Sequence, residues 1–243
     1  MTDASKTLGL IGAAAGILIG GGAVALYQGG GAGGGKREIE QTIRAYLLEH
    51  PEVLREASQR LQQRELGKAV DAQRAAFETP YAGAWAGAQN GDVTLVEFFD
   101  YACGYCRKSN ADVDRLLRED PRLKVVWREW PVLGQDSERA AVVSLAAAQA
   151  GTYRKFYDAM FAAGRPSPEA IARAQQAAGV SAQAVAQIQA SPAAGAELAR
   201  NHQLAESVGA SGTPTFVVGD EVLQGAVGYD ALKKAIETAR SKA

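Results

Sequence analysis

Two cysteines, Cys103 and Cys106, are the residues whose type and spacing point most directly to chemistry. They are the only cysteines in the 243 residues. A disulfide between them closes too short a loop to stabilise a fold strongly. A structural zinc site needs four ligands, but His50 and His202 are the only histidines, lie far away in sequence and receive no predicted role. We therefore predict no metal site, and a dithiol that opens and closes in redox chemistry.

The positions of the two thiols predict different roles for them. The thiolate is the attacking species in disulfide exchange, so the nucleophilic cysteine needs a lowered pKa and access to solvent. Cys103 is expected at a helix N-terminus, where free N–H groups and the helix dipole favour the anion. We predict Cys103 as the nucleophile and Cys106, one turn later, as the less exposed resolving thiol. Gly104 and Tyr105 border the pair and are expected to tune its thiolate, although neither carries a charge.

Glu97 is a carboxylate in an otherwise apolar run, residues 93–99. In a strand it shares one face with Leu95 and Phe99, which is an unfavourable place for a charge. One interpretation is a buried acid–base group of raised pKa that moves the proton of Cys106. The alternative is an exposed glutamate at the end of an edge strand. We favour the first interpretation.

Thr213 and Pro214 precede another predicted strand, residues 215–218. A proline at this place is either a trans residue at a sheet edge or a cis residue in a tight turn. Frequencies alone favour trans, because few X–Pro bonds in folded proteins are cis. The presence of the CxxC motif changes that weighting.

The elements around these residues predict an α/β fold. Residues 93–99 and 123–130 are expected strands, and the helix between them opens at the CxxC motif. A hairpin is expected around residues 219–220, followed by a helix over residues 230–239 with Asp230 as its N-cap. Strand, helix, strand, hairpin and helix make a thioredoxin-like plan.

An Ala-rich helical block, residues 137–207, interrupts this plan as an insertion. The block is expected to break where glycine and proline occur, at Gly151, residues 164–166, Gly179 and residues 191–192. The catalytic domain then covers residues 79–243.

The N-terminal residues are expected to serve in export. Residues 8–27 are uncharged, apolar and roughly long enough to span a bilayer. Residues 1–27 are therefore a signal peptide, with small residues for cleavage at 23–25, or a signal anchor, which we favour slightly. The Gly-rich residues 28–35 follow as a flexible linker. In both cases the rest of the chain is exported to where disulfides persist.

Residues 36–78 are predicted to be helical, with one break at His50 and Pro51. A narrow apolar stripe continues along the second helix among many charged residues. Its members are Val53, Leu54, Ala57, Leu61, Leu66, Val70 and Phe77, with Gln73 in the same register. The stripe either packs on the catalytic domain or pairs with other copies as an oligomeric stalk.

The composition excludes two classes of protein. The 26 Lys and Arg residues balance 27 Asp and Glu residues, so no basic surface for nucleic acid is expected. With two cysteines no disulfide framework is possible, so the fold depends on its hydrophobic core. We expect no cofactor.

The motif Glu-Phe-Phe-Asp-Tyr-x-Cys-Gly-Tyr-Cys at 97–106, together with Gly-Thr-Pro-Thr-Phe at 212–216, resembles the bacterial DsbA-like thiol:disulfide oxidoreductases. The resemblance covers roughly residues 80–243 and implies a thioredoxin fold with a helical insertion. It implies that Pro214 is cis and faces the CxxC motif, beside a backbone edge that pairs with substrate peptide. It also implies that Glu97 is the buried acid of the family.

Two further details narrow the resemblance. Gly104-Tyr105 between the cysteines and Thr213 before the proline form the combination found in the disulfide isomerase DsbC. Residues 40–54 resemble the N-terminal segment of ScsC-type suppressor-of-copper-sensitivity proteins, in which it mediates trimerisation. The resemblance thus favours the stalk and a homotrimer.

These features predict a periplasmic enzyme that exchanges disulfides on exported, cysteine-containing proteins. The favoured activity is that of an isomerase or reductase in an oligomer, kept reduced by a membrane-bound reductase. One alternative is a monomeric disulfide oxidase. An alternative of another class is a Cu(I)-binding or holdase protein, because two sulfur ligands suit Cu(I).

Overall fold

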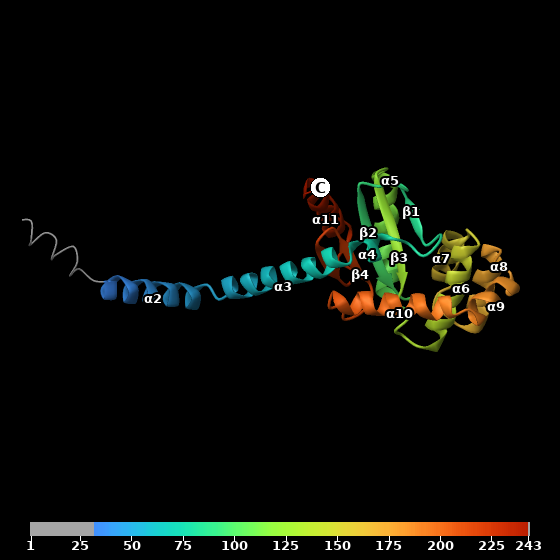
Figure 1. Cartoon of the computed structure of the whole chain (residues 1–243), viewed down its shortest axis with the longest axis horizontal. Helices are drawn as coiled ribbons and strands as arrows, with labels where there is room; N and C mark the ends of the chain where they lie inside the picture. The colour runs from blue at the N-terminus through green and yellow to red at the C-terminus, as the bar shows by residue number, and fades with distance from the viewer. Residues whose placement is uncertain (1–31, 243) are drawn as a thin grey trace, which may run out of the picture. The chain divides into compact units, whose positions relative to one another are not determined.

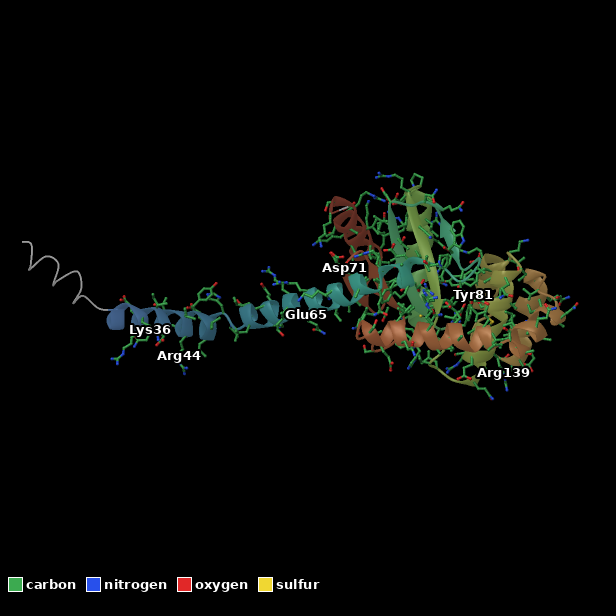
Figure 2. All side chains as sticks on the ribbon, viewed as in Figure 1. Lys36, Arg44, Glu65, Asp71, Tyr81 and Arg139 are labelled. Atoms are coloured by element: carbon green, nitrogen blue, oxygen red, sulfur yellow. The ribbon has the colours of Figure 1, made fainter. Side chains whose placement is uncertain are left out.

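The computed structural model describes residues 32–242, which form two compact units. The first unit, described over residues 32–59, contains helix α2 (Ala32–Glu49) and the beginning of α3 (Glu52–Ala72). The predicted break at His50 and Pro51 is confirmed. It arises because a residue before proline is pushed out of the helical conformation. Lys36 and Arg44 project from α2 into solvent (Figure 2).

The N-terminal boundaries differ in part from the prediction. Helix α2 begins at Ala32, so the linker predicted over residues 28–35 ends earlier than expected. Once residues 36–49 have nucleated a helix, further residues can join its N-terminal end, and the only free-energy cost is the low helix propensity of glycine. The signal or anchor predicted over residues 1–27 lies outside the described residues. Within residues 32–242, no helix is both long and apolar enough to cross a bilayer.

The second unit is built on a five-stranded mixed sheet in the order β1-β3-β2-β4-β5 (Figure 1). Strands β2 (Val93–Phe99) and β3 (Leu123–Glu129) pair in parallel at its centre. The other pairs are antiparallel, and join β1 (Trp85–Gly87), β4 (Thr215–Val218) and β5 (Glu221–Gln224). The predicted strands and hairpin are confirmed.

Helices cover both faces of the sheet because β2 and β3 carry apolar side chains on both faces. On one face, α5 (Gly104–Glu119), α11 (Tyr229–Lys242) and the helical block pack on Leu95 and Val125. On the other face, Val96 and Phe98 lie against α4 (Arg74–Glu78), α10 (Pro192–Ser207) and the end of α3. The central strands are therefore sealed from water on both sides.

The inserted helical block has the predicted breaks. Its helices α6 to α9 lie together at one end of the sheet, and α10 returns along it (Figure 1). Gly179 ends α8 in a left-handed conformation, with φ of 70°, which glycine adopts without strain. The bounds are α6 Gln135–Gln149, α7 Tyr153–Ala162, α8 Pro168–Ala178, α9 Ala182–Ala190 and α10 Pro192–Ser207.

Residues 60–78, predicted as part of the N-terminal segment, belong to the second unit. Val70 and Phe77 are buried in the core. Gly67 lies so close to the β4–β5 turn that a Cβ there would stand 3.1 Å from the carbonyl oxygen of Asp220. The apolar stripe therefore packs on the domain over its last part, and the domain begins earlier than residue 79.

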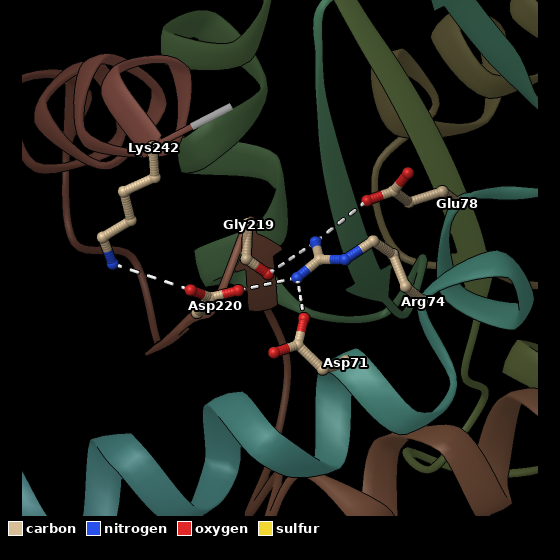
Figure 3. Close-up of polar contacts among 6 residues, drawn as sticks. All are labelled: Asp71, Arg74, Glu78, Gly219, Asp220 and Lys242. Atoms are coloured by element: carbon tan, nitrogen blue, oxygen red, sulfur yellow. Dashed lines mark hydrogen bonds and ion pairs between the residues drawn. The ribbon is translucent and has the colours of Figure 1, made fainter.

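Arg74 fixes this junction through polar contacts (Figure 3). Its guanidinium donates to Asp71, to the Asp220 carboxylate at 2.6 Å and to the Gly219 carbonyl at 3.2 Å. Lys242, at the end of α11, lies 3.6 Å from the other carboxylate oxygen of Asp220. The end of α3, the hairpin turn and the last helix are thus joined by one cluster.

Two local predictions need correction. Strand β1 is missing from the sequence analysis, because three residues, Trp85 to Gly87, are too few to show a periodic pattern. Asp230 is not the N-cap of the last helix, which begins one residue earlier at Tyr229. Asp230 instead lies in the first turn, where its charge favours the positive end of the helix dipole.

Candidate active site

Cys103 is the N-cap of α5 and lies at the edge of the sheet where β2 ends. Its Sγ accepts a hydrogen bond from the Cys106 backbone N–H at 3.3 Å. Only 5% of Cys103 is exposed, less than the sequence analysis expects of a nucleophile. The Thr213 carbonyl oxygen covers it from the opposite side, 3.2 Å from Sγ, and accepts from the thiol.

The surroundings of Cys103 lower its pKa to about 5. The largest cause is a hydrogen bond with the thiol of Cys106, and hydrogen bonds with the backbone of Cys106 and Tyr105 add to it. Burial opposes the change but is smaller. A pKa lowered to about 5 favours the thiolate, the form that attacks disulfides, over the thiol at neutral pH.

Cys106 has the opposite behaviour. It is fully buried, and burial is the main reason that its pKa lies far above the ordinary range. Its hydrogen bond to Cys103 and the charge of Glu97 raise the pKa further. Cys106 thus keeps its proton until a base removes it.

The peptide bond between Thr213 and Pro214 is cis, as the resemblance implies. Pro214 is buried and directly precedes β4, which is paired with β2. Its carbonyl oxygen accepts from the Gly225 N–H at 2.8 Å. The antiparallel pairing of β4 with β2 therefore brings residues 213–214, more than a hundred positions along the chain, against Cys103.

Glu97 lies in the middle of β2 and is completely buried. The interpretation of an exposed edge residue is wrong, because β3 and β4 flank β2 on both sides. The Trp127 Nε1–H donates to Glu97 Oε2 at 3.0 Å. Among the described residues, Oε1 has no hydrogen-bond partner. Burial is the main reason that the pKa of Glu97 rises to about 8, and the nearby Cys103 adds to it.

The profile of the DSBA-like thioredoxin domain matches residues 94–237, and that of the copper resistance protein ScsC N-terminal domain matches residues 36–65. The chain belongs to the DsbA-like thioredoxin family. Its domain is similar to that of a thioredoxin-like oxidoreductase, and its residues 36–65 are similar to the ScsC-type proteins.

Solved structures agree with this assignment. A thioredoxin-like oxidoreductase from Silicibacter pomeroyi is 38% identical, with a TM-score of 0.66, over 70% of this chain and 99% of that one. A periplasmic thioredoxin-like protein from Salmonella enterica is 26% identical, with a TM-score of 0.63, over 69% and 95%. A Proteus mirabilis ScsC variant with a linker deletion is 23% identical, with a TM-score of 0.66, over 86% and 96%, and shows the shared fold.

Curated relatives match over part of their length. The Na(+)/H(+) antiporter NhaA 3 of Salinispora tropica is 26% identical over 160 residues, which are 65% of this chain. The chain spans 24% of that relative's length.

In this DsbA-like site the two residues between the cysteines face outward. A Cβ on Gly104 would meet no atom of the described chain within 4 Å. Tyr105 is 68% exposed. Both residues thus border the pair as predicted, and their side-chain positions are open to solvent.

Asp100 is a buried residue of the site that the sequence analysis misses. Its carboxylate accepts from the Ala102 N–H at 2.7 Å, the Ser137 hydroxyl at 2.7 Å, and the Val132 and Leu133 N–H groups at 2.9 Å. These contacts hold the residue before Cys103 against the loop after β3. A carboxylate between a strand and the CxxC motif is the only sequence signal of this role.

Glu129 is a second buried carboxyl near the site, on the same face of β3 as Trp127. Hydroxyl groups of Ser144, Tyr101 and Tyr153 donate to it. Burial raises its pKa well above the usual range, and the hydrogen bonds from the three hydroxyl groups oppose this change. The strand pattern did not single it out.

The described residues offer few ligands for a metal ion. Within residues 32–242, His, Cys, Asp and Glu side chains form no group of three or more that could hold one. The chemistry of the site therefore has to be argued from the dithiol of Cys103 and Cys106.

Proposed function

We propose that the protein exchanges disulfides on exported proteins as an isomerase or reductase, through Cys103 and Cys106. One observation carries the proposal: Cys103 Sγ lies 3.2 Å from the carbonyl oxygen of Thr213, beside the cis Thr213–Pro214 bond, and Cys106 is fully buried. The pKa of Cys103 is lowered and that of Cys106 is raised. Thiolate attack needs the first thiol ionised, and resolution needs the second thiol to lose its proton later.

In the first step the Cys103 thiolate attacks a substrate disulfide. A bond forms between Cys103 Sγ and one substrate sulfur, while the substrate S–S bond breaks and the other sulfur leaves as a thiolate. In isomerisation, another substrate thiolate then attacks the mixed disulfide and releases Cys103 unchanged. In reduction, the Cys106 proton passes to the Glu97 carboxylate, and the new thiolate attacks Cys103 and releases substrate.

The thiol properties support an enzyme of intermediate oxidising strength. A nucleophile pKa of about 5 lies between the values of roughly 7 for thioredoxin and roughly 3.5 for DsbA. A low pKa stabilises the reduced form and makes the disulfide more oxidising. The raised pKa of Cys106 slows resolution, so a mixed disulfide lasts long enough for substrate to rearrange.

Substrate peptide is proposed to bind beside the cis-proline segment. The backbone before β4 offers an edge for strand addition. The exposed apolar side chains of Tyr105, Val132 and Leu133 offer contact area. Asp100 holds the loop with Val132 and Leu133 beside the start of the CxxC motif.

The N-terminal helices are proposed to join copies of the chain in a homotrimer. Helix α2 and the start of α3 expose large apolar side chains, namely Ile39, Ile43, Tyr46, Leu48 and Leu54, and the first three of these follow helical spacing. Their exposed fractions lie between 53% and 71%, which is costly for a monomer in water. The match of residues 36–65 to the ScsC N-terminal domain supports the same proposal.

We place this activity in the periplasm, where a membrane-bound reductase would keep the isomerase reduced. A relative of the same fold is described as periplasmic, and residues 8–27 have the composition of an export segment.

The experiment is refolding of a scrambled disulfide-containing substrate by the reduced full chain. Recovery of native substrate above that with glutathione alone supports the isomerase, and Cys103→Ser serves as the inactive control. Recovery no greater than glutathione would leave the second candidate, a monomeric oxidase. The lowered pKa of Cys103 is compatible with that candidate as well, because a low pKa of the nucleophile makes the disulfide more oxidising.

A further inference from the structure

Arg154, on α7, lies over the ring of Trp127, which is the only hydrogen-bond donor to the Glu97 carboxyl within residues 32–242. Its guanidinium carbon is 5.3 Å from the centre of the Trp127 ring. The same indole donates its N–H to Glu97 at 3.0 Å. Arg154, Trp127 and Glu97 therefore form a line from a half-exposed cation to a buried carboxyl.

Arg154 is held in this place by two acids. Its Nη2 donates to Asp114 on α5 at 2.7 Å, and its Nε donates to Asp158 on α7 at 2.8 Å. It also lies 5.5 Å from the ring centre of Tyr157. This geometry fixes the guanidinium over the aromatic rings rather than leaving it free in solvent.

We propose that Arg154 is a positioning residue that holds and polarises the Trp127 indole and thereby sets the proton affinity of Glu97. The inference rests on the proposed function, in which Glu97 takes the proton of Cys106. It extends that function to a residue far from either sulfur in sequence.

The physical reason lies in the charge distribution of an aromatic ring. The indole face is negative and its N–H edge is positive, so a cation on the face and a carboxylate at the edge are both favoured. Each interaction polarises the ring in the direction that strengthens the other. The Arg154 charge also attracts the Glu97 carboxylate directly, and lowers its pKa against the effect of burial.

Other groups around Glu97 act on it as well. Cys103 and Asp114 on α5 raise its pKa. The charge of Glu97 in turn raises the pKa values of Tyr153 and Tyr157 on α7 and of Cys106 on α5. Of the charged groups with the largest effects on Glu97, Arg154 is the one cation, so removal of its charge is expected to raise the pKa of Glu97.

The test is an NMR titration of the Glu97 side-chain carboxyl in the full chain with both cysteines replaced by serine. Glu97→Gln identifies the signal, and the Trp127 indole N–H is followed in the same samples. Arg154→Gln is compared with Arg115→Gln. Arg115 is a matched control, because it stacks on Tyr229 at 3.8 Å and pairs with Glu119.

The proposal expects Arg154→Gln to raise the pKa of Glu97 by about half a pH unit to one unit and to shift the indole N–H signal. Arg115→Gln changes neither. Arg154→Lys keeps the positive charge, so the pKa of Glu97 and the indole N–H signal should stay close to those of the protein with Arg154. An unchanged pKa overturns the proposal. A lowered pKa also overturns it, because it shows that Arg154 only keeps water away from Glu97.

The same variants separate this inference from the proposed function. In the intact dithiol, Arg154→Gln is expected to slow resolution of a mixed disulfide about three- to tenfold at pH 7, since fewer Glu97 groups are ionised. If the pKa of Glu97 rises but resolution is unchanged, Arg154 has the inferred role and Glu97 does not serve as the base. In that case only the proposed proton transfer from Cys106 to Glu97 is rejected, and the inference about Arg154 is kept.

Discussion

Cys103 and Cys106 stand three positions apart on one helix, yet their pKa values change in opposite directions. The position of Cys103 at a helix start is visible in the sequence, because a strand pattern ends just before it. The carboxyl of Glu97 could also be placed on the buried face from strand alternation. Its donor, Trp127, could not, since the pairing register of two strands is set by the whole fold.

Replacement of the resolving thiol is expected to trap substrate. Cys106→Ser leaves the Cys103 thiolate able to attack but removes the sulfur that would release it. Mixed disulfides with exported proteins should then accumulate, visible on non-reducing gels and as linked peptides in mass spectrometry. Cys103→Ser is the control and should form none. Trapping through Cys106 instead would reverse the assigned roles.

Burial of Glu97 is expected to make stability depend on pH. Its pKa is about 8 in the folded protein and close to 4.5 when unfolded, so the folded state binds the proton more tightly. This contribution to stability is complete below pH 4.5 and is lost as the pH rises through about 8.

Glu97→Gln should therefore gain stability relative to the wild type as the pH rises from 4.5 to 8. The gain is at most about 5 kcal/mol, because one pH unit corresponds to about 1.4 kcal/mol. Urea unfolding at several pH values measures it, with the exposed Glu138→Gln as control. A difference independent of pH contradicts the buried acid.

At the level of elements, long periodic segments were predictable and short or charged ones were not. The central strands, the helix after the CxxC motif and the breaks of the helical block follow from alternation, glycine and proline. Strand β1 has three residues and exists because β3 offers it a partner. The contacts of buried Arg128 were equally invisible, because its acceptors come from distant helices.

Arg128, on β3, is 1% exposed and joins three elements. It pairs with Glu197 of α10 at 2.9 Å and donates to carbonyl groups at the end of α4, those of Ala76 and Phe77. Arg128→Met should destabilise the fold by about 3–5 kcal/mol in urea unfolding, because it leaves Glu197 buried without its partner.

The matched control is Arg139→Met, which breaks a surface pair with Asp136 and should cost less than about 1 kcal/mol. Adding Glu197→Gln to Arg128→Met should recover part of the loss. Equal losses for Arg128 and Arg139 would show that the buried pair has no special role.

At the scale of the whole molecule, the large apolar side chains Ile39, Ile43 and Leu48 of α2 are exposed within the first described unit. The helices of residues 36–78 were predictable from sequence. Which part of their apolar stripe is buried could not be predicted, since only packing decides that Val70 is buried while Leu54 is exposed.

The full chain is therefore expected to have the mass of a trimer in light scattering. Replacing Ile39 and Ile43 by Glu should give a single-chain mass, because charges are unfavourable in an apolar helix interface. Arg37→Glu with Gln41→Glu, on exposed polar positions of the same helix, should leave the trimer intact. A single-chain mass for the unmodified protein contradicts the proposal and favours the monomeric oxidase.

The most direct test of the account is the pH dependence of alkylation at each cysteine of the reduced full chain, read by mass spectrometry. The account predicts that Cys103 reacts at half its maximal rate near pH 5, while Cys106 stays unmodified at neutral pH. Reaction of both cysteines with the ordinary thiol pKa of about 8.5, or of Cys106 first, would contradict it.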